Sequence, residues 1–471
     1  TTLNTYSFQK CASLETVKLN SSTSEIPNYC FSGCSSLSNI NIPAGLTSIG
    51  NSAFTGASFT SFDLSNVTSI GTYAFQNNAS LSKVKLADNL IELPNYLFQN
   101  CQSLKEIKLP SNLTSIGDYT FSNTGITSIK FGQYLSTIGE RAFNDCTSLK
   151  TIDLSENKVL ASLGELCFDN CSSLTNFAIP TSVTTLGNFV FQDCIGLTGT
   201  MKISSSVTSI AKNPFAGCLN IDGVEVDSDN PEYRNSEIGA LYSADDELIY
   251  YPEKATGEVT ISADITVRAN AFERCDGITK IILSEGIEEI PASAFSYMYS
   301  LEEIVLPSTL KVINSKAFEY DTKLLSLTLP EGLETLATYA FSQCGIESLT
   351  IPSSIESIPY SCFSKCPNLK TVNLGTITEI GSYAFEYCSA LEEIVIPNTV
   401  TNLGSYIFRE SGIKKVTIPA SIVTFGSNNF KKCTQLAEVT LEEGVTTLPS
   451  YTFDGCTALT SITLPLSLIH I

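Results

Sequence analysis

The chain of 471 residues contains no tryptophan and a single histidine, His470. One histidine at the end of the chain cannot supply the Ser–His or Cys–His pairs of nucleophilic catalysis. No G-x-x-x-x-G-K-S/T phosphate loop and no dinucleotide-binding glycine motif occurs, and no apolar run approaches the ~20 residues needed to cross a membrane. Adjacent carboxylates such as Glu302 and Glu303 point to opposite faces of a strand, so they cannot act as an acid–base pair. These absences argue against an enzyme, and we expect no cofactor and no metal.

What the chain has is a phenylalanine that returns at a nearly fixed interval. Of the 18 spacings between 19 such positions, 17 lie between 21 and 25 residues. A period of this length is typical of stacked supersecondary units, each of which buries its apolar face against its neighbours. The sequence therefore predicts a solenoid. The positions are Phe8, Phe31, Phe54, Phe75, Phe98, Phe121, Phe143, Phe168, Phe191, Phe215, Phe272, Phe295, Phe318, Phe341, Phe363, Phe385, Phe408, Phe430 and Phe453.

The repeat that begins at Leu104 shows what its positions do. Side chains alternate along a strand, so Ile107 and Leu109 are predicted to point inward while Glu106 and Lys108 point outward. Stacking such strands predicts one long parallel sheet on the concave face. The segment around each phenylalanine is expected to form a short helical turn or irregular structure on the convex face. The predicted fold class is a leucine-rich repeat solenoid, a curved right-handed β-solenoid-like array.

A glycine follows a second apolar segment in many repeats, as Gly50 follows Leu46-Thr-Ser-Ile49. Proline occupies the same slot elsewhere and requires φ near −65°, so the slot is predicted to have negative φ. Glycine there is expected to reflect close packing and not a need for positive φ. The prolines in this slot are Pro27, Pro94, Pro291, Pro359 and Pro449.

Two structural ladders are predicted inside the stack. Stacked rings should fill each coil, represented by Phe98, Phe121, Phe143, Phe341 and Phe385. Thirteen of the 16 cysteines fall three residues after a landmark phenylalanine, among them Cys101, Cys146, Cys171 and Cys194. Ala57, Thr124 and Ser411 replace cysteine in other repeats, so we interpret the slot as a place for a small buried side chain and not for a metal ligand. Disulfides stay open as an alternative, because pairs such as Cys30 and Cys34 lie close in sequence, and the redox compartment stays open as well.

The 57 residues from Phe215 to Phe272 exceed one period, which predicts a β-hairpin insertion over residues 219–262 between array halves 1–218 and 263–465. Five aspartates gather there: Asp222, Asp227, Asp229, Asp245 and Asp246. Their spacing lacks the glycine and glutamate of an EF-hand loop. A solvated acidic loop is the favoured interpretation, and a calcium site is the alternative.

The last six residues, 466–471, are predicted to fit no repeat position. They match the translation of a transposon-end sequencing adapter, so we expect a non-native tail, with a natural apolar tail as the alternative. The chain also starts inside a repeat and shows no polar capping repeat, which predicts a fragment of a longer protein.

The formal net charge of −21 disfavours nucleic-acid phosphate and anionic membranes as partners. The outward strand positions nevertheless carry a basic stripe in the first half, and β-branched residues in the second. We expect no aromatic hot spot on this face. The candidate ligand-binding residues are Lys83, Lys85, Glu106, Lys108, Lys130 and Asp153.

The repeat Leu-x-x-Ile-x-Leu-Pro-x-x-Leu-x-x-Ile-Gly-x-x-Ala-Phe-x-x-Cys resembles the BspA-like leucine-rich repeat family. The resemblance covers residues 1–465, with representative copies at Leu104–Phe121, Leu391–Phe408 and Leu436–Cys456. The segment from Asp229 to Pro252 also looks like an insertion common in that family. The resemblance implies secreted or surface proteins of host-associated bacteria and some protist parasites, with roles in adhesion or co-aggregation, and it brings no catalytic residues.

The leading hypothesis is a monomeric, adhesin-like protein at the cell surface or outside the cell, which binds a protein or glycan through its concave face. One alternative is a structural spacer that presents a terminal domain. The other is an intracellular scaffold.

Overall fold

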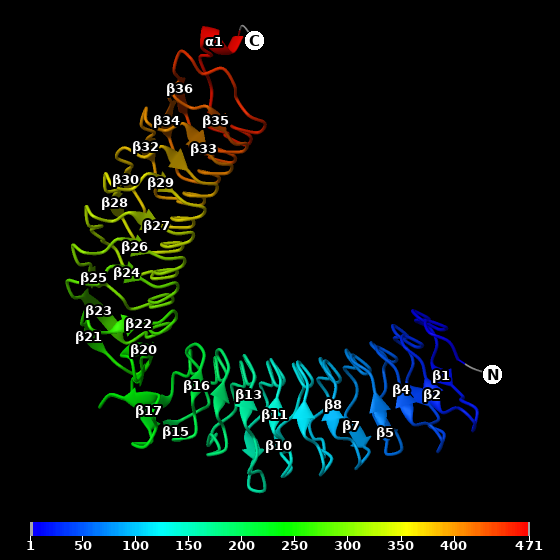
Figure 1. The fold of residues 1–471 in the computed structure, drawn as a ribbon. Coiled ribbons are helices and arrows are strands. Elements are labelled where there is room, and N and C mark those ends of the chain that lie inside the picture. The colour runs from blue at the N-terminus through cyan, green and yellow to red at the C-terminus, as the bar shows by residue number, and fades with distance from the viewer. Residues whose placement is uncertain (1–2, 470–471) are drawn as a thin grey trace. The chain divides into compact units, whose positions relative to one another are not determined.

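The structure is a computed structural model that describes residues 3–469. The chain forms a parallel-strand solenoid of about 19 turns with almost no helix, as the repeat predicts. It divides between Ala244 and Asp245 into two compact units, each of which is a stack of coils (Figure 1).

The first strand series comes from the Leu-x-x-Ile-x-Leu segments. Register is kept from coil to coil, so Ile129 lies opposite Ile152 and the inward side chains stack. In the first unit its members are β1 (Thr16–Val17), β3 (Asn39–Ile40), β5 (Ser61–Leu64), β7 (Lys83–Leu86), β10 (Ser128–Lys130), β12 (Thr151–Asp153), β15 (Gly199–Ile203) and β17 (Ile221–Val226). In the second they are β21 (Gly257–Ile261), β23 (Ile278–Leu283), β25 (Glu303–Val305), β28 (Ser348–Thr350), β30 (Thr371–Asn373), β32 (Glu393–Val395), β34 (Lys415–Ile418) and β36 (Glu438–Leu441).

A second parallel series, which the sequence interpretation missed, comes from the Ser-Ile-Gly segments. Each member has only two residues, except for the four-residue β20. In the first unit they are β2 (Glu25–Ile26), β4 (Ser48–Ile49), β6 (Ser69–Ile70), β8 (Glu92–Leu93), β9 (Ser115–Ile116), β11 (Thr137–Ile138), β13 (Ser162–Leu163), β14 (Thr185–Leu186) and β16 (Ser209–Ile210). In the second they are β20 (Glu247–Tyr250), β22 (Thr266–Val267), β24 (Glu289–Ile290), β26 (Val312–Ile313), β27 (Thr335–Leu336), β29 (Ser357–Ile358), β31 (Glu379–Ile380), β33 (Asn402–Leu403) and β35 (Thr424–Phe425).

The prediction of one long sheet needs correction. The first series is divided into several small sheets. Segments 104–109 and 324–329 join a neighbouring coil only through single bridges, Lys85 to Lys108 and Ser326 to Ser348, and segment 175–179 forms no strand. That the first series lines a concave face stays a prediction.

The glycine slot behaves as predicted. Gly164 does not have positive φ, and a Cβ atom added there would lie 2.5 Å from the carbonyl carbon of Gly139 in the preceding coil. The close approach of successive main chains therefore explains the glycine, whose conformation is an ordinary one.

The turn around each phenylalanine is irregular and not helical. The residues two before and two after the ring, such as Tyr96 and Asn100 around Phe98, have φ near +60°. A right-handed helix cannot continue through such residues. Their N–H groups instead donate to the next coil, as Tyr96 N donates to the carbonyl oxygen of Asp118 across 2.8 Å.

The landmark phenylalanine rings are stacked at the centre of the coils. Phe98, Phe121 and Phe143 are fully buried, with centroid distances of 5.8 and 5.3 Å between successive rings. Phe341 and Phe385 are buried in the same way, each against Phe363. Such ring pairs each stabilise a fold by about 0.5–1.5 kcal/mol beyond their burial.

The predicted insertion contains the antiparallel hairpin of β18 (Tyr233–Asn235) and β19 (Leu241–Ser243). β17 and β21, which also lie within 219–262, pair in parallel with neighbouring coils, so the departure from the stack is shorter than that range. In the second unit Tyr251 stands in the phenylalanine slot, with its ring stacked 4.5 Å from Phe272. The array boundaries themselves stay a prediction.

The tail begins with a short helix, α1 (Leu466–Ile469). Ser467 Oγ donates to the carbonyl oxygen of Val445, as Thr309 Oγ1 donates to that of Ile287. Leu466 and Ser467 therefore do occupy repeat positions, contrary to the sequence interpretation. A non-native origin stays a prediction, and residues 470 and 471, including His470, lie outside the described residues. Within residues 3–469, no helix has the length and apolar character needed to cross a membrane.

Candidate functional site on the strand face

The predicted basic stripe lies on the outward face of the first strand series. Along β7 the exposed side chains of Lys83 and Lys85 alternate with the more buried side chains of Val84 and Leu86. In the next coil Lys108 lies opposite Lys85 in a parallel bridge. A groove of about 790 Å³ runs over these coils, lined among others by Lys83, Lys105, Glu106, Lys108, Lys130 and Asp153. Five of the six predicted site residues thus line one groove, and Lys85 lies beside it.

The lysines of this stripe differ in their partners. Lys130 Nζ lies 2.8 Å from Glu156 Oε1 and 3.8 Å from Asp153 Oδ2. The hydrogen bond to Glu156 raises the pKa of Lys130, while hydrogen bonds from Ser155 lower the pKa of Asp153.

Lys83, Lys85, Lys105 and Lys108, which we call the lysine row, make no ion pair within 4.0 Å in the part of the chain that is described. All four are exposed. The row is therefore a cluster of exposed lysines without close ion pairs on an acidic molecule, and only Lys85 has a carboxylate, that of Asp63, opposite it in register.

Corresponding lysines in the second unit are neutralised. Lys280 lies 3.5 Å from Glu258 and 3.4 Å from Glu303, one coil on either side. Three further pairs are Lys370–Glu347 at 2.7 Å, Lys414–Glu392 at 2.6 Å and Lys415–Glu438 at 2.7 Å. The two units thus present strand faces of different electrostatic character.

The β-branched positions of the second unit are exposed. Val305 is 40% and Val395 is 73% accessible. Isolated exposed valines on strands are explained by strand propensity and do not by themselves form a site.

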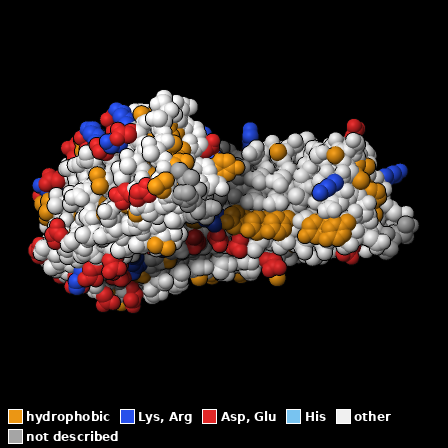
Figure 2. Space-filling view, turned by 90° about the horizontal axis from the view of Figure 1, so that it is seen from above, with side chains coloured by type: hydrophobic (Ala, Val, Ile, Leu, Met, Phe, Trp, Pro, Cys, Tyr) orange, Lys and Arg blue, Asp and Glu red, His pale blue; other side chains and the backbone are white. Residues whose placement is uncertain are grey.

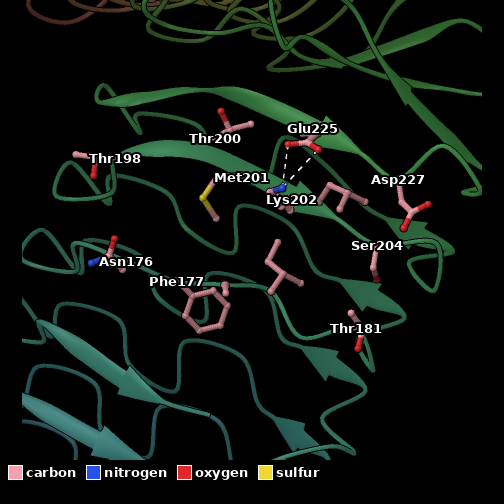
Figure 3. Close-up of a pocket in the computed structure, with 13 residues that line it drawn as sticks. Asn176, Phe177, Thr181, Thr198, Thr200, Met201, Lys202, Ser204, Glu225 and Asp227 are labelled. Carbon is pink, nitrogen blue, oxygen red and sulfur yellow. Dashed lines mark hydrogen bonds and ion pairs between the residues drawn. The ribbon is translucent and has the colours of Figure 1, made fainter. Parts of the chain in front are cut away.

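A cavity of about 530 Å³ opens on the strand face of the first unit beside β15 and β17 (Figure 3). Its lining includes the buried side chains of Phe177, which belongs to the strandless segment 175–179, and Met201 of β15. At its rim Lys202 Nζ lies 3.2 Å from Glu225 Oε2. Its one lysine is neutralised, so this cavity offers no free cation comparable to those of the lysine row.

Rows of tyrosine are a feature that the sequence interpretation missed. Tyr96 stacks between Tyr73 and Tyr119 with centroid distances of 4.4 and 4.7 Å, and Arg141 covers the far face of Tyr119. Figure 2 shows rows of hydrophobic side chains, the class in which tyrosine is coloured, on the visible surface of the first unit. The signal was in the sequence, since tyrosine recurs two residues before the landmark phenylalanine. Because the rings face one another, the row presents edges and not faces, and we assign it to packing.

The cysteines have a structural role. All 16 are free, and all but Cys11 and Cys456 are fully buried. Burial raises the pKa of Cys101 to about 12 and that of Cys146 to about 11, which suppresses the thiolate that nucleophilic chemistry requires.

The aspartates of the insertion make local turn contacts, such as the hydrogen bond from Asp229 N to Asp227 Oδ1 at 3.0 Å. Within residues 3–469, no group of three or more His, Cys, Asp or Glu side chains is placed to hold a metal ion.

Comparison with known proteins gives a family. The sequence profile of the BspA type leucine rich repeat region matches residues 1–126, 114–236, 250–370 and 357–471. No curated protein matches.

Three solved structures are similar to this chain, and the first of them shows the same fold. A leucine-rich repeat protein from Eubacterium ventriosum is 21% identical, with a TM-score of 0.50, over 73% of this chain and 92% of that protein. The pneumococcal vaccine antigen PcpA is 19% identical, with a TM-score of 0.43, over 91% of this chain and 89% of that protein. A leucine rich cell surface protein from Faecalibacterium prausnitzii is 19% identical, with a TM-score of 0.42, over 91% and 88%. The profile match along most of the chain shows that this protein belongs to the BspA-type leucine-rich repeat family.

Proposed function

We propose that the chain is a non-enzymatic, adhesin-like interaction protein that binds a protein or glycan of a host or neighbouring cell through the outward face of its first strand series. Leucine-rich repeat families consist in general of non-enzymatic scaffolds. A solenoid offers a broad continuous surface, which suits an extended ligand. The lysine row carries the proposal, because four exposed lysines gather there in and beside one groove and make no ion pair within 4.0 Å among the described residues.

The proposal includes a location outside the cell or at its surface and a monomeric binding unit. The family resemblance supports the location. The monomeric state is supported by the repeat architecture, in which each coil packs against its neighbours in the same chain.

The test is a binding measurement on the full chain. Purified protein should bind immobilised matrix proteins or intact host cells saturably, and the Lys85→Glu, Lys108→Glu, Lys130→Glu variant should bind at least about tenfold more weakly. The matched control is Lys158→Glu, Lys323→Glu, Lys365→Glu, which makes the same charge change at exposed lysines elsewhere. Equal weakening by both variants, or none by either, would remove the site assignment. Absence of any saturable binding would remove the function.

An intracellular scaffold is the second candidate, favoured by the presence of 16 free cysteines. Free thiols are typical of reducing compartments. Protease treatment of intact source cells separates the two, because a surface protein is digested while an intracellular one is protected.

A further inference from the structure

The lysine row has a geometry of its own. Lys85 and Lys108 occupy equivalent positions on adjacent coils, and the neutralised Lys130, which is not part of the row, takes that position one coil further on. Paired main chains lie about 4.8 Å apart, so Lys85 and Lys108 offer two cations at that interval along the solenoid axis. A linear ligand that lies along this axis meets Lys85 and then Lys108, with Lys83 and Lys105 on the same two coils.

The surroundings of the row leave it positive. Asp63 lies opposite Lys85 in register on β5, and Glu106 lies between Lys105 and Lys108 in sequence. Neither carboxylate makes an ion pair within 4.0 Å with the row among the described residues, although the charge of Lys85, after hydrogen bonds from Ser65, helps to lower the pKa of Asp63. The groove itself is lined by four lysines and two carboxylates, which leaves it positive on a chain of net charge −21.

The side chains that line the groove restrict the chemical class of ligand that it can bind. The groove is lined by lysine and contains no arginine, so it lacks the planar fork that binds carboxylates in bidentate fashion. Lysine acts as a point charge with freely rotating donors, which suits tetrahedral oxyanions that present oxygens in several directions. No aromatic side chain lines the groove, so stacking on bases or rings contributes nothing.

We propose that the lysine row binds a linear polysaccharide that carries sulfate esters, laid along the solenoid axis across the coils of Lys85 and Lys108. An extended acidic peptide fits less well, since side chains on one side of a strand recur only every second residue, about 6.8 Å apart. A sulfated polysaccharide can carry more than one ester on each sugar ring, so its charges lie closer together than the alternate side chains of an extended peptide. The inference rests on the proposed function, because it names the ligand class of the same face.

The structure also sets one end of this site. Lys130 stands in line with Lys85 and Lys108, but Glu156 and Asp153 neutralise it. Replacing these carboxylates by amides, in Asp153→Asn, Glu156→Gln, should add a cation to the row and tighten binding by several-fold.

The experiment uses the full chain and three probes: dextran sulfate, uncharged dextran and poly-glutamate. Dextran sulfate should bind, and its affinity should fall linearly with the logarithm of salt concentration, as counterion release requires. The Lys85→Glu, Lys108→Glu variant should lose at least about tenfold in affinity and show a shallower salt slope. The Lys158→Glu, Lys323→Glu control should stay within about twofold of the unmodified chain, and uncharged dextran should not bind.

The outcomes separate the two proposals. Failure to bind dextran sulfate, equal binding of poly-glutamate, or equal loss in the control variant would each overturn the sulfated-polysaccharide assignment. If matrix proteins or cells are still bound in that case, the interaction function stands alone. If dextran sulfate binds through the row but no cell or matrix protein is bound, the ligand class stands and the adhesin proposal fails.

Discussion

The thiol of Cys388 donates a hydrogen bond to the main-chain carbonyl oxygen of Phe363, one coil earlier, across 3.1 Å. Equivalent thiol bonds recur along the array, with distances of 3.0 Å from Cys146 and 2.9 Å from Cys433. In these repeats the cysteine slot holds a small side chain that donates a hydrogen bond to the preceding coil, which the alanine at position 57 in the same slot cannot do.

Replacing this thiol should test that hydrogen bond. Cys388→Ala should lower the free energy of unfolding by about 1–2 kcal/mol, because the buried carbonyl oxygen loses its donor. Cys388→Ser should lose less, since a hydroxyl can donate and accept as well. Urea denaturation followed by circular dichroism measures the difference, and exposed Cys11→Ala is the neutral control. Equal losses for alanine and serine would show that volume and not hydrogen bonding decides.

Asp321 occupies the same slot and is fully buried. Its Oδ1 accepts Met298 N across 2.9 Å, while Oδ2 has no hydrogen-bond partner in the described part of the chain. Burial raises the pKa of Asp321 well above its usual range. An ionised carboxylate can only accept, so it cannot supply the donor that a thiol gives to the preceding phenylalanine carbonyl.

Asp321→Cys and Asp321→Asn should therefore stabilise the protein at neutral pH by about 1–3 kcal/mol. Asparagine already fills this slot once, where Asn78 Nδ2 donates to the carbonyl oxygen of Phe54 across 2.8 Å. Because the folded-state pKa of Asp321 is raised, its favourable contribution is complete below the unfolded pKa near 4 and is lost as pH rises through the folded value. The advantage of the variants should consequently shrink toward acid pH. A constant difference between acid and neutral pH would contradict ionisation as the cause.

The glycine slot predicts a steric penalty. A Cβ atom at Gly164 would lie 2.5 Å from the carbonyl carbon and 2.6 Å from the carbonyl oxygen of Gly139. Gly164→Ala should therefore destabilise the first unit by about 1–3 kcal/mol, as overpacking does elsewhere. Gly45→Ala is the matched control, since its Cβ atom would have 4.0 Å to the nearest main-chain atom. Thermal unfolding compares the two, and similar midpoints would show that the coils separate without strain.

Thiol labelling should follow burial. In the folded protein the exposed Cys11 should react first with a chromogenic disulfide reagent. The half-buried Cys456 should react more slowly, since burial raises its pKa to about 12. All 16 thiols should react after denaturation. Rapid reaction of more than these two in the folded state would show that the coils open locally.

The repeating coil could be predicted from the sequence, because each repeat contains the residues that define its own turns and inward positions. The phenylalanine period, the inward positions such as Ile107 and the proline-tolerant glycine slot depend on residues within one coil, and sequence spacing expresses them directly. Family membership followed from the same repeat.

Tertiary structure decided what depends on neighbouring coils. Lys130 and Lys108 look alike in sequence, yet only Lys130 meets carboxylates, because Glu156 reaches it from the next coil. Tyr251 in the phenylalanine slot and the two-residue strands of the second series likewise arise only when coils stack. The sequence by itself determined a stack of coils with a buried ring ladder and an outward basic stripe. Contacts across coils decided which lysines form ion pairs and which buried groups have hydrogen-bond partners. Both interactions require atoms within a few ångströms of each other, and only the folded stack brings them that close.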